Sequence, residues 1–180
     1  MTELETERLR LRRWRDDDLA DLARINADPE FTRYLTPDGS PISAEQSAGQ
    51  LERFRRHWDE WGFGVWAVEE RGASHFVGRV GVQYHRLWAD DPEVGWGLDP
   101  AVWGRGYATE AGAATIEHAF AKLSVERLVS IVHPDNSPSI RVQERLGIHP
   151  WQSVAWPQGG IVLEVRAVER DEWARLQSSA

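Results

Sequence analysis

The stretch that decides the fold is EVGWGLDPAVWGRGYATEA, residues 93–111. Residues 93–98 have the composition of a strand, a turn follows at 99–100, and a helical period of small and apolar residues begins after Gly106. Gly104 and Gly106, in the intervening loop, can adopt positive φ and bring backbone N–H groups close together. The first turn of a helix has unpaired N–H groups and a partial positive charge. This segment is therefore suited to bind a pyrophosphate.

A Gly-x-Gly turn before a helix is also consistent with a tight loop that only closes a strand–helix joint. Two other phosphate-binding motifs do not fit. A P-loop requires a lysine after its last glycine, and the segment contains none. A dinucleotide fingerprint requires a third glycine, whereas Tyr107, Ala108 and Thr109 follow Gly106. Arg105 would add a charge-assisted contact to a bound phosphate.

The patterns on both sides of this segment predict a mixed chain. Strands are expected at about 6–14, 64–70, 76–84, 93–98, 128–132, around 154 and 161–168, and helices after 16–18, from 43 towards 61, from 106 to about 123, from 138 to 146 and up to about 176. The segment 29–41, which contains several Pro and Gly residues, is expected to form turns. An antiparallel run followed by strand–helix–strand–helix predicts an α+β fold. Its sheet is mostly antiparallel, with one parallel junction in the middle and helices at its flanks.

The bulk properties describe one globular domain that spans residues 1–180. No apolar run approaches the roughly 20 residues of a membrane span, and the N-terminus has no signal-like apolar core. We therefore expect a soluble, cytoplasmic protein that does not bind membranes. The absence of cysteine excludes thiolate ligands and a cysteine nucleophile, and the histidines lack ligand spacing, so we expect no metal.

The net charge of −8 argues against a nucleic-acid partner, because an acidic surface repels phosphate backbones. The same surface would tolerate or attract a cationic amine, or it is simply a solubilising surface. The ten tryptophans are expected mainly in the core or an interface, with a minority lining a pocket for such an amine. Exposed tryptophans would be compatible with a homodimer.

Three blocks of sequence resemble one family. Residues 103–111, WGRGYATEA, resemble the acetyl-CoA loop of the GNAT superfamily of N-acetyltransferases, with Trp103 in place of the leading Gln or Arg of its Gln/Arg-x-x-Gly-x-Gly/Ala pattern. That tryptophan is similar to the RimJ/RimL-like branch. So are TERLRLR at 6–12, and NSPS at 136–139 followed by ERLG at 144–147. The resemblance thus extends from residue 6 to residue 147.

The resemblance implies where a cofactor would lie. It implies a splayed sheet with the pantetheine arm between residues 93–98 and 128–132, and backbone amides near Leu98 that hold the thioester carbonyl. It implies that Trp103, Gly104, Arg105, Gly106, Tyr107, Ala108 and Thr109 contact acetyl-CoA, and that Asn136 and Ser139 lie beside the pantetheine. In this scheme Ser139 reprotonates the leaving thiolate. Capping of the helix at Pro138 is the alternative role of Asn136.

Glu93 is the candidate general base. On a strand it shares a face with Gly95 and Gly97, whose missing side chains would leave space for ligand and water. A surface carboxylate or a structural ion pair is the alternative. Making a lysine-like amine neutral at pH 7 costs about 4–5 kcal/mol, whereas an α-amine costs about 1 kcal/mol. A strong base therefore matters most for lysine-like amines.

We therefore expect an acetyl-CoA-dependent N-acetyltransferase, without a metal, that acetylates a primary amine by direct attack in a ternary complex. The amine is either a protein N-terminus or a small molecule. A non-enzymatic module that binds CoA and a nucleotide-binding protein of another class are the alternatives.

Overall fold

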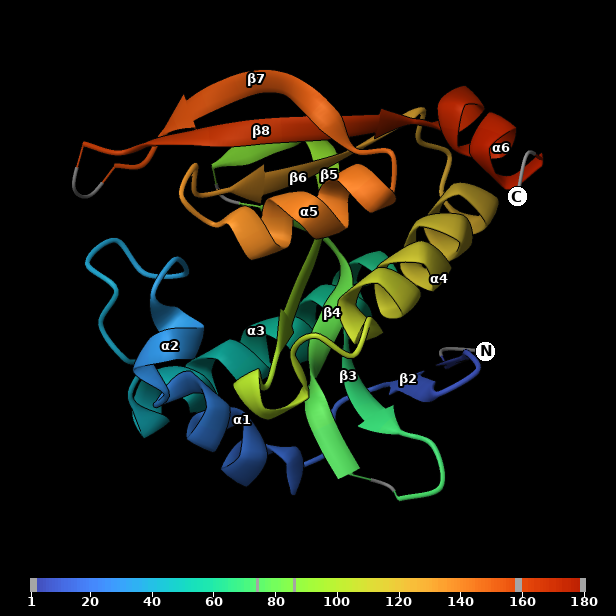
Figure 1. Ribbon diagram of the computed structural model, residues 1–180. Helices are drawn as coiled ribbons and strands as arrows, with labels where there is room; N and C mark the ends of the chain where they lie inside the picture. Colours follow the sequence, from blue (N-terminus) through green and yellow to red (C-terminus); the bar gives the residue numbers. More distant parts are fainter. Residues whose placement is uncertain (1–2, 74, 86, 158–159, 179–180) are drawn as a thin grey trace.

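The computed structural model describes residues 3–73, 75–85, 87–157 and 160–178 (Figure 1). Eight strands form one sheet in the order β1-β2-β3-β4-β5-β6-β8-β7. The strands are β1 (Leu4–Glu5), β2 (Leu9–Arg12), β3 (Val65–Glu70), β4 (His75–His85), β5 (Trp88–Leu98), β6 (Arg127–Val132), β7 (His149–Ala155) and β8 (Val162–Glu169). The helices are α1 (Asp18–Asn26), α2 (Pro29–Thr32), α3 (Ala44–Trp61), the 3-10 turn η1 (Pro100–Val102), α4 (Tyr107–Lys122), α5 (Ser137–Arg145) and α6 (Arg170–Ser178). The predicted α+β class is confirmed.

The sheet divides at the pair β5–β6. These strands are parallel, and they pair at the single register position Glu93–Val129. Beyond Glu93, β5 follows its antiparallel partner β4 and moves away from β6. Figure 1 shows the result: β2, β3 and β4 lie in one half of the molecule, and β6, β8 and β7 lie in the other. The predicted parallel junction is therefore confirmed, and it opens the sheet.

Local sequence explains the two ends of the long helix α3. α3 begins at a capping box in which the Ser43 side chain accepts from the Gln46 N–H and the Gln46 side chain accepts from the Ser43 N–H. It ends at Gly62, whose φ of 73° is the left-handed conformation typical of a helix C-terminus. The predicted hairpin of β3 and β4 is also present.

Three local expectations were wrong. The predicted strand 6–14 is shortened to β2 at Leu9–Arg12, because the Thr6 N–H bonds to the Leu9 carbonyl and residues 6–9 form the turn that follows β1. α2 and η1 replace predicted turns. In each case an Asp precedes Pro, and the Asp28 and Asp99 side chains accept the N–H two residues later, which caps the first turn.

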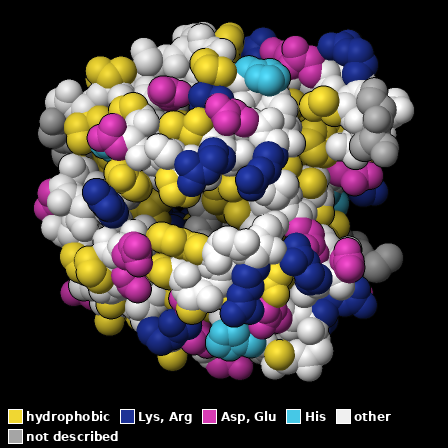
Figure 2. Space-filling model, in the orientation of Figure 1, with side chains coloured by type: hydrophobic (Ala, Val, Ile, Leu, Met, Phe, Trp, Pro, Cys, Tyr) yellow, Lys and Arg dark blue, Asp and Glu magenta, His cyan; other side chains and the backbone are white. Residues whose placement is uncertain are grey.

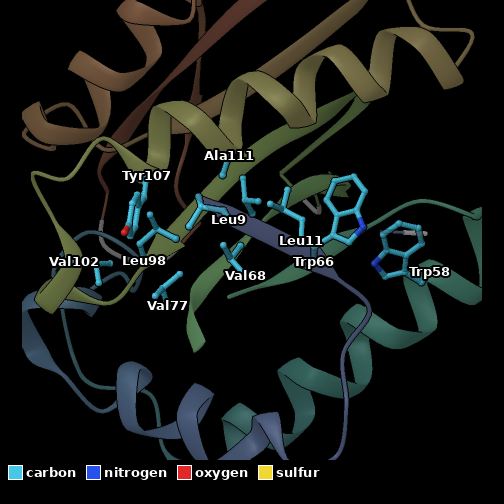
Figure 3. Close-up of a cluster of buried hydrophobic side chains, with 11 residues drawn as sticks. Leu9, Leu11, Trp58, Trp66, Val68, Val77, Leu98, Val102, Tyr107 and Ala111 are labelled. Carbon is cyan, nitrogen blue, oxygen red and sulfur yellow. The ribbon is translucent and has the colours of Figure 1, made fainter. Parts of the chain in front are cut away.

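The part of the core that supports the first half of the sheet lies on both of its faces. On one face, Leu9, Leu11 and Val68 pack against Tyr107 and Ala111 of α4 (Figure 3). The other face, which includes Val65 and Ala67, packs against α1, α2 and α3. α4 therefore covers one side of β4 and β5, and α1–α3 cover the other.

The tryptophans, predicted mainly for the core or an interface, lie both in the core and at the surface. Trp58 and Trp66 are buried in the cluster of Figure 3. Trp61 and Trp103 are exposed, and Trp88 packs edge-on against Trp151. Within the described ranges, none of the helices is both long and apolar enough to cross a membrane.

A buried ion triad joins β2, α1 and β3. The Arg12 guanidinium donates to both carboxylate oxygens of Asp18 at 2.8 and 2.6 Å, and its Nε donates to Glu69 at 2.7 Å. All three side chains are buried. Removing the cation would leave the buried Asp18 without a counter-charge and Glu69 with only the exposed Arg15, 3.7 Å away, which is much more costly than losing a surface pair.

We expect Arg12→Ala to lower the free energy of unfolding by about 3–5 kcal/mol. The matched control is Arg10→Ala, because Arg10 pairs with Glu3 at the surface, and such a pair contributes about 1 kcal/mol or less. Urea unfolding of the two variants measures the difference. Equal losses would contradict a structural role for the triad.

Candidate active site

Two cavities adjoin at the division of the sheet. The larger, here the loop cavity, has a volume of about 640 Å³ and lies between the loop before α4, helix α5 and residues 30–35. The smaller, here the sheet cavity, has about 260 Å³ and lies over β4, β5 and β6. Both are lined by Tyr34, Leu35, Trp96, Asn136 and Ser139, so they meet at these residues. Figure 2 shows this face of the molecule hollowed, with hydrophobic side chains on the walls and Lys or Arg side chains along part of the rim.

The loop before α4 is shaped by its glycines. Gly104 and Gly106 have φ of 77° and 81°, the left-handed region that favours glycine. A Cβ added at Gly104 would meet no atom within 4 Å, so the loop is open to the cavity there. Gly104, Gly106, Tyr107, Ala108 and Thr109 all line the loop cavity.

The same loop offers donors that fit a diphosphate. The first-turn N–H groups of α4 lack intrahelical partners, as at any helix start. Among the described residues the buried Thr109 Oγ1 has no hydrogen-bond partner, and Thr109 lines the cavity. A buried hydroxyl without a partner is costly unless a ligand or water bonds to it. The chemistry of the loop therefore fits the phosphates of CoA.

Trp103 and Arg105 occupy different sides of the loop. The Trp103 indole N–H donates to the Leu98 carbonyl at 2.8 Å, which ties the loop to the end of β5, and both residues line the loop cavity. Arg105 does not line either cavity, and its guanidinium lies 3.3 Å from Glu70. The Tyr107 hydroxyl donates to the same carboxylate. The structure thus brings the predicted loop residues together with the exception of the Arg105 side chain.

Glu110 connects the N-terminal motif to the loop. Its Oε1 accepts from the Thr6 hydroxyl at 2.5 Å and from the Arg8 N–H at 2.8 Å, and its Oε2 accepts from Arg8 Nε at 2.7 Å. Arg8 also donates to the Arg105 carbonyl at 2.9 Å. Burial alone would raise the pKa of Glu110, but the bonds from Thr6 and Arg8 outweigh it and hold that pKa below its ordinary value. Two distant motifs are therefore one structural unit around the loop.

Asn136 and Ser139 lie where the cavities meet. The Asn136 Oδ1 accepts from the Ser139 N–H at 3.2 Å and caps α5, with Pro138 in the first turn. The capping role of Asn136 is thus observed. The cap uses Oδ1 alone, and both residues line both cavities.

Glu93 lies on the face of β5 opposite α4, at its single pairing position with β6. The side chain is buried and lines the sheet cavity, and Gln83 Nε2 lies 3.4 Å from its Oε2. Burial raises the pKa of Glu93 above its ordinary value, against the opposing effects of His85 and of hydrogen bonds from Gln83 and the Ile131 backbone. A raised pKa makes this carboxylate a better base than an exposed one.

Gly95 and Gly97 differ in the free space above them. A Cβ at Gly95 would meet only Glu93, at 3.9 Å, so the predicted space is present there. At Gly97 the expectation was wrong. A Cβ would lie 3.0 Å from the Phe31 ring and 3.3 Å from the Arg79 guanidinium, so these side chains fill the space.

Several lining residues escaped prediction. Arg79 lines the sheet cavity, Arg141 and Arg145 of α5 line the loop cavity, and Tyr34 and Leu35 line both. The signal for Arg79 was its place in a strand pattern, on the same face as Gly81 and Gln83. Tyr34 and Leu35 lie in a segment where only turns were expected.

Comparison with known proteins now identifies the fold. A model of the acetyltransferase (GNAT) domain matches residues 8–149, most of the chain. The chain belongs to the GNAT acetyltransferase family. Membership makes it an acyltransferase rather than a nucleotide-binding protein of another class, and GNAT acetyltransferases use acetyl-CoA.

Individual relatives agree with this assignment. The chain is 28% identical over 148 residues to the uncharacterized N-acetyltransferase YoaA of Bacillus subtilis (strain 168), covering 80% of this chain and 81% of YoaA. The crystal structure of an acetyltransferase from Agrobacterium tumefaciens str. C58 has a TM-score of 0.82 and 27% identity, covering 94% of this chain and 95% of that one.

A third relative concerns the resemblance to the RimJ/RimL-like branch. Mycobacterium smegmatis RimJ in complex with CoA-disulfide has a TM-score of 0.75 at 19% identity, covering 95% of this chain and 88% of RimJ. At this identity the likeness concerns the fold, and it agrees with the sequence resemblance to the RimJ/RimL-like branch. In the part of the chain that the structure describes, no group of three or more His, Cys, Asp or Glu could hold a metal ion.

We expect Glu110→Ala to loosen the loop, because Thr6 and Arg8 lose their shared acceptor. The free energy of unfolding should fall by about 1–2 kcal/mol, and amides of residues 104–110 should exchange faster with deuterium. Glu117→Ala is the matched control, since Glu117 is exposed on the same helix. Identical exchange of the loop in the two variants would contradict the role of Glu110.

Proposed function

We propose that this GNAT enzyme acetylates the nitrogen of a primary amine, by direct attack within a ternary complex of enzyme, acetyl-CoA and amine. The observation that carries the proposal is the meeting of the two cavities at the division of the sheet. A cofactor in the loop cavity and an amine in the sheet cavity would face each other there, beside Asn136 and Ser139. Holding two reactants in contact supplies much of the rate enhancement for an acyl transfer.

The residues that would hold acetyl-CoA are those of the loop cavity. The backbone N–H groups of the loop and the Thr109 hydroxyl suit the diphosphate, and Arg141 and Arg145 add positive charge nearby. The end of β5 at Leu98 and the opening beside β6 suit the pantetheine arm. When bound, acetyl-CoA supplies an already activated thioester.

Glu93 is the proposed general base. It is buried, it lines the sheet cavity, and the open space over Gly95 separates it from the place where the cavities meet. An amine in this space would lose its proton to the Glu93 carboxylate directly or through one water. Because burial raises the pKa of Glu93, the carboxylate is better matched to this task than an ordinary surface group.

Ser139 is the proposed proton donor. Its backbone N–H is used in the α5 cap, while the side chain lines the boundary of the two cavities. The hydroxyl can therefore pass a proton to the sulfur as the carbon–sulfur bond breaks and the new amide forms, and it regains a proton from water at the cavity boundary. The described residues include no cysteine, so the proposal requires no covalent enzyme intermediate.

The loop is tested by Gly104→Val. The β-branched side chain would point into open cavity space and obstruct the phosphates, so we expect the dissociation constant of CoA to rise by roughly tenfold or more. Gly72→Val is the matched control, because Gly72 also has positive φ and open space but lies in the β3–β4 turn. Isothermal titration with CoA measures both. Equal affinity in the two variants would remove the loop from the binding site.

The base is tested by Glu93→Gln, which keeps the shape and removes the charge. We expect kcat to fall about 100-fold or more, with little change in the KM for acetyl-CoA. Glu60→Gln, at an exposed position of α3, is the control. Thiol release from acetyl-CoA in the presence of an amine panel measures the rate.

The pH profile adds a second readout. Glu93 acts as a base only when ionised, so its contribution is lost as the pH falls through its raised pKa. This loss begins at a higher pH than for an ordinary carboxylate. A Glu93→Gln enzyme with the parent kcat and the parent pH profile would contradict the proposed base.

A further inference from the structure

The sheet cavity contains a cation as well as the proposed base. Arg79 on β4 pairs in register with Gly97, and Gln83 pairs with Glu93. Alternate residues of a strand share a face, so the Arg79 and Glu93 side chains lie on the same side of the sheet, both lining this cavity. The Arg79 guanidinium lies over Gly97, and the Glu93 carboxyl group lies next to Gly95. Neighbouring positions on one strand face are about 7 Å apart.

Arg79 is held in place by neutral groups. Its guanidinium lies 5.2 Å from the centre of the Phe31 ring and 5.9 Å from that of Phe54, and its Nη1 is 3.4 Å from the Asn26 Oδ1. Among the described residues no carboxylate lies within ion-pair distance of it. Burial lowers the pKa of Arg79 to about 10, so the group still carries its charge at neutral pH.

Other arginines of this chain are paired with a carboxylate, as is usual for a buried guanidinium. The buried Arg12 pairs with Asp18 at 2.6 Å, and the buried Arg166 lies 3.1 Å from Glu164. Arg79 is half-buried, so its guanidinium is partly withdrawn from water, and the cost of this desolvation is not offset by an ion pair. Arg79 thus has unused capacity to bind an anion, and it faces a cavity.

The anion is not expected to be a cofactor phosphate. Arg79 lines the sheet cavity and not the loop cavity, where Gly104, Thr109 and Arg141 lie. The sheet cavity, at about 260 Å³, has room for a molecule of amino-acid size. Its other titratable lining groups are Tyr34, His85 and His133, so Glu93 is its one lining carboxylate among the described residues.

We infer that the acceptor is a small amine that also carries a carboxylate or another compact anion, which Arg79 binds while the amine lies beside Glu93. The inference rests on the proposed function and narrows its substrate class to amino-acid-like compounds. A planar guanidinium forms paired, charge-assisted hydrogen bonds with a carboxylate, which fixes orientation as well as affinity. Binding the anion at Arg79 would hold the amine near Glu93 and the cavity boundary.

The test compares matched acceptors of the same shape, with and without the anion. A panel of α-, β- and γ-amino acids is assayed beside the corresponding carboxamides, with thiol release from acetyl-CoA as the readout. We expect at least one acid to exceed its carboxamide by about tenfold or more in kcat/KM, which is the size of one charge-assisted interaction. The carboxamide amine is the less basic of the two, so more of it is neutral and the comparison is biased against this result.

Variants assign the preference to Arg79. Arg79→Met keeps the length of the side chain and should abolish the preference by raising the acceptor KM, with CoA affinity unchanged. Arg79→Lys keeps a charge and should retain part of the preference. Arg56→Met, at an exposed position of α3, is the control and should behave as the parent. Circular dichroism checks that each variant is folded.

The outcomes separate this inference from the proposed function. Carboxamides or neutral-peptide N-termini acetylated as well as the acids, or a preference that survives in Arg79→Met, would overturn the inference and leave the acetyltransferase intact. Peptides with an acidic second residue form a further arm, and their selective acetylation over the amino acids would also overturn the small-acceptor assignment. No thiol release with any amine would overturn the proposed function and this inference with it.

Discussion

The parallel pair between Glu93 and Val129 is the constraint on which the site depends. A strand cannot pair along its whole length with two neighbours that diverge. β5 pairs antiparallel with β4 along most of its length and with β6 at one position only. β6 is instead paired antiparallel with β8 throughout. The backbone is therefore left unpaired between the two halves of the sheet, and this is the place where the loop cavity and the sheet cavity meet.

The two faces of the sheet at this division differ in character. Val82 and Val94 point to the α4 side and pack into a hydrophobic cluster with Ile116. Their sequence neighbours Gln83 and Glu93 point the other way, towards α1–α3, and form a polar lining of the sheet cavity. The alternation of a strand thus lets one short segment of β5 support the core on one side and chemistry on the other.

Much of this arrangement could be predicted because its signals are local. The capping box at Ser43, the hairpin of β3 and β4, and the strand–loop–helix from 93 to 122 each follow from neighbouring residues. The details that escaped depend on contacts between distant segments. Arg105 turns outward because Glu70 lies beside it, and Gly97 is covered because α2 brings Phe31 over it. Neither contact can be predicted from a single stretch of sequence, because Glu70 and Phe31 are distant in the chain from Arg105 and Gly97.

The contacts of Glu110 are a second feature that the sequence did not predict. The blocks at 6–12 and 103–111 are far apart in the chain, and their motifs gave no reason for occurring together. The structure supplies the reason, since Thr6 and Arg8 bond to Glu110 and Arg8 also bonds to the Arg105 carbonyl. A side-chain network of this kind holds a loop that has little packing of its own.

The most direct measurement of the central claim is a crystal structure of the protein with CoA bound. The account predicts the diphosphate within hydrogen-bond distance of backbone N–H groups in residues 104–109, and the pantetheine arm in the opening between β5 and β6. A diphosphate bound elsewhere on the molecule, or an arm that does not enter this opening, would contradict it.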